Sequence, residues 1–363
     1  MTNSHTFPFW TWLAPVIGVL ALIGFSLPLS TWVQTLLALI GLMGSVLAAV
    51  YHAEVVAHRV GEPFGTLVLA IAVTIIEVAL VIALMLSADT TTASTLPRDT
   101  VFATVMIILN GIIGVCLLIG GSRFGEQHFG SDGVRAALIT LTAIIVLTLV
   151  LPNFTTSEYG PAYSDKQLGF VALVSVILYG TFVFVQTVRH RDYFLPRGGH
   201  FADESVHAAP PTNRIALISL VLLLVCLVAV VLLGKALSPA IESTIKAWGA
   251  PHALVGVIIA MLVLLPEGVA SLQAARANRL QTSLNLALGS ALATIGLTIP
   301  TVAIISLING WTLTLGIDAK STVLLVVSLF IVSISLGVGR TTIMQGVVHL
   351  VIFATYLFMT IVP

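Results

Sequence analysis

Residues 69–84 read LAIAVTIIEVALVIAL, an almost unbroken apolar stretch whose one charged side chain is Glu77. A second such stretch, residues 258–275, reads IIAMLVLLPEGVASLQAA and contains Glu267. Both belong to apolar runs long enough to cross a hydrocarbon core about 30 Å thick as a helix. Because these runs lack the alternating polarity of barrel strands, they predict membrane helices.

The composition of the whole chain has the same character. Of its 363 residues, 58% are hydrophobic and 8% are charged. Soluble domains carry about 25% charged residues, so the surroundings of this chain are predicted to be membrane lipid. The acidic and basic residues number 15 each, which gives no indication of a nucleic-acid partner.

We therefore predict an all-α polytopic membrane protein with about eleven transmembrane helices. The predicted spans are 11–29, 31–51, 63–87, 100–121, 134–151, 168–187, 213–234, 252–275, 281–307, 320–337 and 342–362. Residues 188–212 are rich in proline, glycine and polar side chains, and this pattern predicts a cytoplasmic linker.

The linker divides the predicted helices into comparable groups. We assign residues 1–30 to an extra N-terminal helix, 31–187 to a first five-helix repeat and 213–363 to a second. Two five-helix units in series have opposite orientations in a membrane, which is the inverted-repeat plan of many secondary transporters. The second helix of each unit contains one deep glutamate, Glu77 or Glu267.

The basic residues predict the orientation. If the chain changes sides at every span, one set of loops carries ten basic residues and the other carries five. The positive-inside rule then places the N-terminus in the cytoplasm and the C-terminus in the periplasm, with the helices crossing the cell inner membrane.

Glu77 and Glu267 are the candidate cation- and proton-binding residues, and the two that would hold a metal cation. An ionised carboxylate at the bilayer centre costs at least about 2.5 kcal/mol, so such residues generally mark ion or proton pathways. Two carboxylates in one apolar pocket repel each other, and they retain protons until a cation compensates their charge. The alternative is that each glutamate is protonated and only hydrogen-bonded between helices.

Four further side chains are candidate cation ligands, because hard cations prefer oxygen: Thr74, Asn110, Asn285 and Ser290. Interhelical hydrogen bonding is the alternative role of each. Pro266 predicts a helix that is broken, or else merely kinked, before the second glutamate. His52 and His58 form either a solvated helix end or a cluster that responds to pH.

Three stretches resemble one family of proteins. Residues 59–77, RVGEPFGTLVLAIAVTIIE, are similar to the first alpha repeat of the calcium/cation antiporter superfamily. Residues 264–300, LLPEGVASLQAARANRLQTSLNLALGSALATIGLTIP, are similar to the second. Residues 120–129, GGSRFGEQHF, resemble a signature of the cation/proton exchanger branch, which includes the bacterial ChaA-type sodium(potassium)/calcium–proton antiporters.

This resemblance implies ten core helices in two inverted bundles plus one extra helix, with alternating access around the glutamates. The chain departs from the family where Val73-Thr74 and Val263-Leu264 replace the usual Gly-Asn before each glutamate. Fewer amide oxygens are therefore expected near the ion.

The predicted function is secondary active antiport that exports Ca²⁺ and/or Na⁺, with K⁺ as a further candidate, in exchange for protons. We expect no cofactor, and a homo-oligomer is compatible with the sequence. One alternative is an intramembrane enzyme that uses the two glutamates as acid and base, although the sequence has no HExxH motif or phosphate-binding loop. The other is a cation channel, which would pass ions without moving protons.

Overall fold

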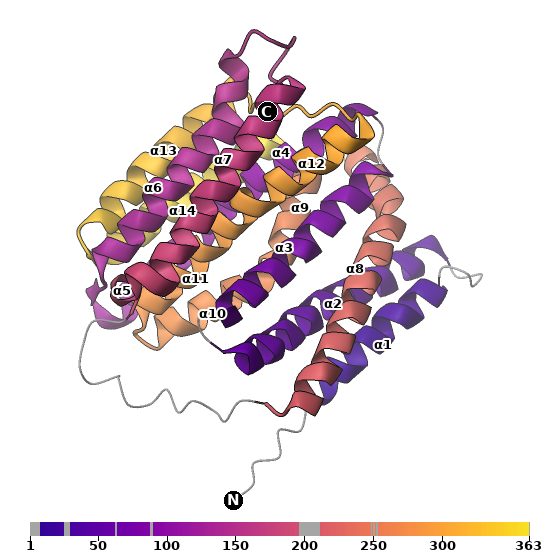
Figure 1. Ribbon diagram of the computed structural model, residues 1–363, viewed down its shortest axis with the longest axis horizontal. Coiled ribbons are helices and arrows are strands. Elements are labelled where there is room, and N and C mark those ends of the chain that lie inside the picture. The colour runs from indigo at the N-terminus through magenta and orange to yellow at the C-terminus, as the bar shows by residue number, and fades with distance from the viewer. Residues whose placement is uncertain are drawn as a thin grey trace, which may run out of the picture. The chain divides into compact units, whose positions relative to one another are not determined.

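The computed structural model describes residues 8–24, 30–61, 64–87, 90–195, 211–247, 249, 251 and 253–362. Nearly all of the described residues are helical, which confirms the predicted all-α class (Figure 1). The chain divides into two compact units, the first within residues 1–89 and 204–248 and the second within 90–203 and 249–363. Residues 196–210 of the predicted linker lie outside the described residues.

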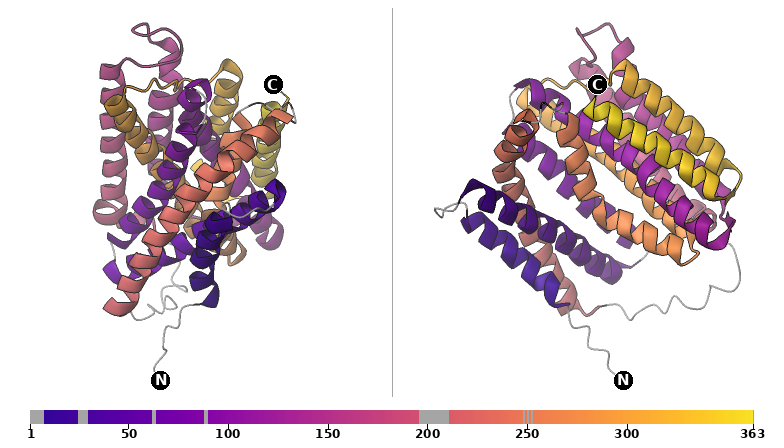
Figure 2. Two further views of the ribbon diagram at one scale, coloured as in Figure 1. Left: turned by 90° about the vertical axis from the view of Figure 1, so that its right-hand side faces the viewer. Right: turned by 180° about the vertical axis from the view of Figure 1, so that it is seen from behind.

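The first unit is a group of helices packed around α2. It consists of α1 (Phe9–Gly24), α2 (Thr31–Val60), α3 (Phe64–Met85) and α8 (Asn213–Ala247). α2 packs against α1, α3 and α8, and these helices are drawn in indigo to purple and in salmon in Figure 2. Glycines permit the close approach of α1 and α2, because a Cβ atom on Gly41 would lie 3.3 Å from the Cα atom of Gly18.

The C-terminal part of α2 differs from its prediction. The helix continues to Val60, beyond the predicted end at residue 51. His52 is fully buried, and its ring nitrogens lie 3.4 Å from the Ser219 hydroxyl and 3.2 Å from the carbonyl oxygen of Thr11. The interpretation of His52 as part of a solvated helix end is therefore wrong, because packing against α1 and α8 extends the buried surface beyond the apolar run.

The second unit contains the remaining helices. They are α4 (Thr90–Met106), η1 (Ile107–Ile112), α5 (Ile113–Phe124), α6 (Ser131–Ile145), η2 (Val146–Val150), η3 (Leu151–Phe154), α7 (Asp165–Phe184), η4 (Val185–Arg189), η5 (Arg191–Tyr193), α9 (Ala253–Val263), α10 (Leu265–Arg276), α11 (Leu280–Ala293), η6 (Thr294–Thr298), α12 (Ile299–Asn309), α13 (Ala319–Gly337) and α14 (Ile343–Ile361). Of these, η1, η2, η4 and η6 are π-helical turns, whereas η3 and η5 are 3₁₀ turns.

Two contacts join early and late segments within the second unit. The short antiparallel strands β1 (Gln127–His128) and β2 (Arg340–Thr341) pair between the α5–α6 and α13–α14 turns. Beside them, α14 packs directly on α5 through glycines. A Cβ atom on Gly121 would lie 2.5 Å from the backbone nitrogen of Ile343, and one on Gly114 would lie 3.1 Å from the Cβ atom of His349.

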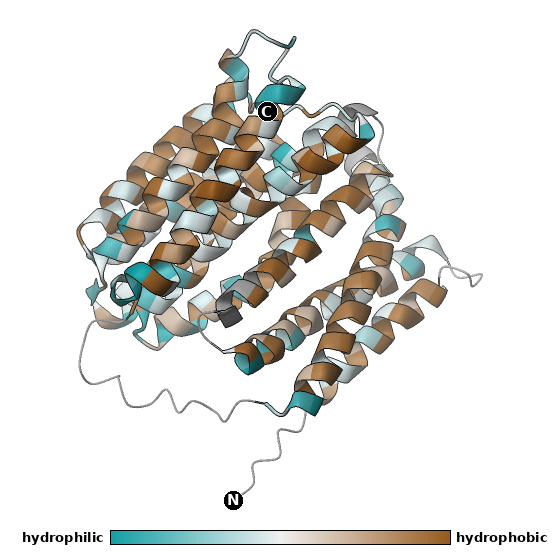
Figure 3. Cartoon of the chain, viewed as in Figure 1, coloured by the Kyte–Doolittle hydropathy of each residue, from teal (hydrophilic) through white to brown (hydrophobic). Residues whose placement is uncertain are grey.

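The helices have the surface of a multi-pass membrane protein. Among the described residues, eight helices are long and apolar enough to cross a membrane, and the bent pair α9–α10 would make nine. Leu217, Val221 and Leu224 lie on one face of α8 and are 62%, 53% and 55% exposed. Figure 3 shows hydrophobic residues along the helices and many of the hydrophilic ones near their ends. The predicted count of eleven spans stays a prediction. α1 and residues 71–85 of α3 are apolar but shorter than the helices that are long enough to cross a membrane.

Candidate cation and proton site

Glu77 lies in the middle of α3, a continuous helix of the first unit. Its side chain is 1% exposed, and Thr74, one turn earlier, is 7% exposed. The spacing of three residues puts both on one side of the helix, whereas Ile71 and Ile75 are 43% and 46% exposed. The first glutamate thus shares the buried side of an otherwise apolar helix with one hydroxyl group.

The contact of α3 with α8 is close just beyond Glu77. Leu80 is buried, and a Cβ atom on Gly234 of α8 would lie 2.6 Å from its Cδ2 atom. Glycine at this position therefore lets α8 approach the helix one turn after the glutamate.

Glu267 lies in a different backbone setting in the second unit. α9 ends at Val263 and α10 begins at Leu265, with a bend of 55° between them. Pro266 lacks an N–H group, and its ring would clash with the carbonyl four residues earlier in an uninterrupted helix. At the start of a new helix the same residue is tolerated. The predicted break is confirmed, and Glu267 occupies the first turn of α10, where the helix dipole favours negative charge.

Ser290 lies level with this glutamate. α10 and α11 pack on each other on either side of a turn at Asn278, whose φ is 58°. Glu267 and Ser290 are nearly equally far from that turn along the chain, so both lie about 17 Å from it along their helices. A Cβ atom on Gly289 would meet nothing within 4 Å, so the backbone beside Ser290 borders open space.

Ser271 is a polar residue that the sequence analysis missed. It follows Glu267 by four residues, and this spacing puts both side chains on one face of α10. Ser271 is fully buried, and its hydroxyl has no hydrogen-bond partner among the described residues. The spacing from the glutamate is the signal that could have identified this residue as a further oxygen ligand.

Asn285 is engaged by the protein itself. Its Nδ2 atom donates to the carbonyl oxygen of Phe194 at 2.6 Å, and its Oδ1 atom accepts from Gln281 at 3.1 Å. These bonds attach the segment after α7 to α11. Asn285 also lies about 7.5 Å nearer the turn than Ser290, so the structure does not bring it level with Glu267.

Asn110 is turned away from α10. Ile112 of η1 faces α10, because a Cβ atom on Gly268 would lie 3.5 Å from its Cδ1 atom. Residues two positions apart point to nearly opposite sides of a helix, and Asn110 faces α13 and α14. Its Nδ2 atom donates to the Ser328 hydroxyl at 2.9 Å, and its Oδ1 atom lies 3.2 Å from Nδ1 of His349.

The structure therefore puts Thr74 on the same side of its helix as Glu77 in the first unit, and Ser271 on the same side as Glu267 in the second, where Ser290 lies level with Glu267 on the adjacent helix. It does not bring Asn110 or Asn285 to either glutamate within those units. That the two glutamates share one site stays a prediction, as do the ligand roles of all six predicted residues.

Comparisons with known proteins identify the relatives of this chain. The family model for the sodium/calcium exchanger protein matches residues 30–188 and 218–362. The protein y4hA of Sinorhizobium fredii is 48% identical over 99% of this chain and 98% of its own length. The sodium-potassium/proton antiporter ChaA of Escherichia coli is 38% identical over 89% of this chain and 87% of its own length.

A solved structure has the same fold. The crystal structure of the H⁺/Ca²⁺ exchanger CAX matches with a TM-score of 0.72 at 19% identity, over 96% of this chain and 88% of the other.

The helical fold, with one buried and one partly buried glutamate among apolar helices, is that of a multi-pass membrane transporter. The chain belongs to the sodium/calcium exchanger family. The resemblance found in the sequence is confirmed, and because the relatives are transporters, the chain is not an enzyme. The channel alternative is not favoured either.

Proposed function

We propose that this protein is a secondary active antiporter that exports Ca²⁺ and/or Na⁺, with K⁺ as a further candidate, in exchange for protons. Glu77 and Glu267 are the residues whose carboxylates bind the exported cation and the protons. The observation that carries the proposal is the deep placement of one acid in the second helix of each sequence half, in a chain of an exchanger family.

Exchange follows from the charge of such a site. Two ionised carboxylates without a counter-charge have a high free energy in an apolar interior. The site therefore switches from facing one side of the membrane to facing the other only when its charge is neutralised. Protons or a cation provide this neutralisation, and binding of one displaces the other. Alternating access of the neutralised forms then couples the two fluxes and suppresses uncoupled leak.

Two observations support the proposed repeats at residues 31–187 and 213–363, with α1 as the additional helix of an eleven-span protein. The family match covers two stretches, one on each side of the linker. In each half, the helix after the glutamate helix contains a π-helical turn, η1 in the first and η6 in the second. Such turns occur frequently at functional sites.

The proposed orientation in the cell inner membrane has a cytoplasmic N-terminus and a periplasmic C-terminus, because the loops that would be cytoplasmic carry ten of the fifteen basic residues. The cation then leaves the cytoplasm as protons enter from the periplasm.

The ion ligands beyond the two carboxylates are oxygens of the α3 and α10–α11 segments. Thr74, Ser271 and Ser290 supply hydroxyl groups, and the break before α10 frees backbone carbonyls at the end of α9. The name of the relative at 38% identity specifies sodium and potassium, which favours the monovalent ions as cargo. The name of the structural relative CAX specifies Ca²⁺, which makes Ca²⁺ the competing cargo.

The test is exchange in inverted vesicles that hold a respiration-generated pH gradient. Adding Na⁺, K⁺ or Ca²⁺ separately should dissipate the gradient for the transported ions, as read by a pH-sensitive dye. Glu77→Gln and Glu267→Gln should each abolish the response. The control is Glu158→Gln, the same chemical change at an exposed acid, which should retain wild-type exchange. Full activity in either of the first two variants would refute the assigned roles.

A further inference from the structure

The stretch GGSRFGEQHF, residues 120–129, lies outside the site described above. It forms the end of α5, the strand β1 and part of the turn to α6. β1 pairs with β2 of the α13–α14 turn, and the backbone N–H of Phe129 donates to the carbonyl oxygen of Gly339 at 2.9 Å. Backbone hydrogen bonds thus join two turns at one end of the second unit. In the proposed orientation this end faces the cytoplasm.

Gln127 attaches a third turn at the same end. Its side chain is 2% exposed, and its Nε2 atom donates at 2.8 Å to Oδ1 of Asn278, in the turn between α10 and α11. The backbone N–H of Gly130 donates at 2.6 Å to Oε1 of Gln281, in the first turn of α11. These two bonds hold the α10–α11 hairpin to the α5–α6 turn, and we call them the hairpin clasp.

Asn278 is joined rigidly to the helix that contains Glu267. Its own N–H donates to the carbonyl oxygen of Ala275 at 3.1 Å, and the N–H of Arg279 donates to that of Ala274 at 2.9 Å. With a φ of 58° at Asn278, these bonds are the Schellman motif that ends a helix. From there α10 runs about 17 Å to Glu267 as one regular helix. A displacement of Asn278 is therefore transmitted to the glutamate.

The other end of α10 is the break in the span. α9 and α10 meet at an angle of 55° at Leu264, just before the turn that contains Glu267. A few residues at such a helix end can absorb a change in backbone dihedrals, so the break does not by itself fix the direction of α10. The clasp supplies a fixed point at the opposite end of the helix.

The amide of Gln127 is enclosed by the protein. A Cβ atom on Gly120 would overlap its Oε1 atom, and this oxygen is buried with no hydrogen-bond partner among the described residues. Exchanging the two ends of the amide would still leave one bond to Asn278 and one polar atom against Gly120. An unpaired buried polar atom typically costs more free energy than one neutral hydrogen bond contributes. The amide therefore does not stabilise the fold, and its presence requires another explanation.

We propose that Gln127 is a positioning residue for the exchange reaction. Through Asn278 it fixes the direction of α10, and thereby the place of the Glu267 carboxylate among the other ligands of the cation. Gln127 itself contacts neither the cation nor the proton. Its amide suits this role because a hydrogen bond is directional and sets the distance between the two turns. The inference rests on the proposed exchange at Glu267 and adds a residue that acts on it from the end of the bundle.

The first test is Gln127→Met, which keeps an unbranched side chain of similar length and removes its hydrogen-bonding groups. The melting temperature should stay the same or rise, because an unpaired buried atom is lost and the exposed Asn278 can bond to water. The KM of exchange, measured with Na⁺, K⁺ and Ca²⁺ separately, should rise about tenfold for the transported ions. The maximal rate per folded protein should change much less. Gln273→Met, the same change at an exposed position of α10, should leave KM unchanged.

The second test separates the hydrogen bond from the shape of the turn. Asn278→Gly removes the acceptor but permits the positive φ, whereas Asn278→Asp keeps an oxygen that can accept from Gln127. KM should rise about tenfold in the glycine variant and stay near the wild-type value in the aspartate variant. Gln127→Met combined with Asn278→Gly should have the KM of either single variant, because both changes remove the same bond.

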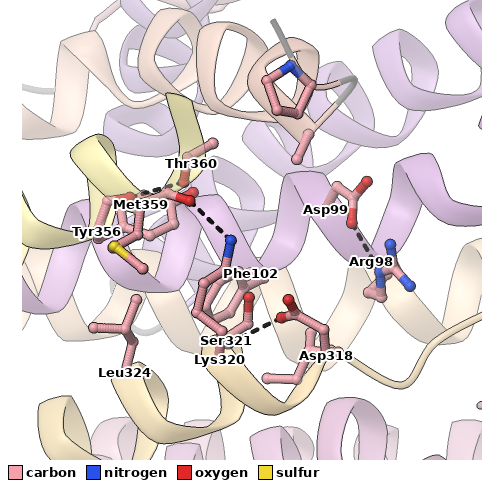
Figure 4. Close-up of a pocket in the computed structure, with 13 residues that line it drawn as sticks. Arg98, Asp99, Phe102, Asp318, Lys320, Ser321, Leu324, Tyr356, Met359 and Thr360 are labelled. Carbon is pink, nitrogen blue, oxygen red and sulfur yellow. Dashed lines mark hydrogen bonds and ion pairs between the residues drawn. The ribbon is translucent and has the colours of Figure 1, made fainter. Parts of the chain in front are cut away.

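A bond at the opposite end of the unit is the control for a purely structural role. A cavity of about 190 Å³ lies there, where α13 begins and α14 ends. Beside it Lys320 of α13 donates to the carbonyl oxygen of Met359 of α14 at 2.8 Å (Figure 4). This bond also joins two helices, but neither helix contains a proposed cation ligand. Lys320→Met should lower the melting temperature and leave KM unchanged.

A folded Gln127→Met protein with the wild-type KM would overturn the positioning role, whether or not its melting temperature falls. Additive effects of Gln127→Met and Asn278→Gly on KM would overturn it too, since the shared bond would then not be the cause. If Gln127→Met does not fold, the comparison of Asn278→Gly with Asn278→Asp decides. If the wild type itself exchanges no cation for protons, the proposed function fails, and the inference fails with it.

Discussion

The two glutamate helices carry the same acid at the same place in the predicted repeats but have different backbones. α3 continues through Glu77, which is 1% exposed, whereas α9 and α10 break just before Glu267, which is only partly buried. The difference arises from one residue, since Pro266 stands where α3 has Ile76. A repeated motif therefore does not dictate a repeated backbone. The first acid is fixed within a regular span, and the second lies where helix ends leave backbone groups available to an ion.

The largest effect is expected from moving the proline into the intact helix. Ile76→Pro would remove a backbone hydrogen bond in the middle of α3 and introduce a ring clash, at a cost of about 3 kcal/mol or more. We expect a greatly lowered melting temperature in detergent and no exchange. A stable, active Ile76→Pro protein would mean that α3 tolerates the same break as α9–α10. The difference between the two backbones would then have no effect on exchange.

The reverse change tests whether the break is needed. Pro266→Ala restores the backbone N–H, so the helix can continue toward Glu267. We expect exchange to fall about tenfold or more, as for other shifts of positioned groups, while the melting temperature stays the same or rises. Leu265→Ala, a truncation at the neighbouring half-exposed position, is the matched control and should retain exchange. Wild-type transport by Pro266→Ala would show that the acid alone matters.

The smallest effects concern the packing beside each glutamate. A Cβ atom on Gly234 would lie 2.6 Å from Leu80, whereas one on Gly268 would lie 3.5 Å from Ile112, an ordinary contact distance. Gly234→Ala should therefore cost about 1 kcal/mol, because the leucine must move. Gly268→Ala should leave stability unchanged or raise it by up to about 1 kcal/mol through helix propensity. Unfolding of both variants under the same conditions measures the difference, and equal losses would contradict the tighter packing inferred at α3.

Features set by local chemistry could be predicted from the sequence. The apolar runs predicted membrane helices because lipid requires every backbone polar group to be satisfied within the segment. Pro266 predicted the break because the effect of proline acts within one turn. The apolar runs did not predict where α2 and α8 end, because packing in the first unit keeps polar residues helical beyond Tyr51 and Lys235.

The features that could not be predicted from the sequence depend on contacts between residues far apart in the chain. The sequence predicts Asn110 as an ion ligand, and tertiary packing decides that its side chain bonds to residues of α13 and α14. The bond from Asn285 to Phe194 likewise joins residues that no periodicity relates. Ser271 is different, since its four-residue spacing from Glu267 was visible in the sequence.

The direct packing of α14 on α5 has a consequence for biogenesis. α5 enters the membrane early in synthesis, yet the surface around Gly114 and Gly121 is shaped to receive the backbone of a helix that leaves the ribosome much later. Until then this glycine-containing face of α5 lacks α14 as a packing partner. Assembly of the second unit is therefore completed only after α14 is translated, and a substitution that prevents α14 from packing would leave α5 inserted without its partner helix.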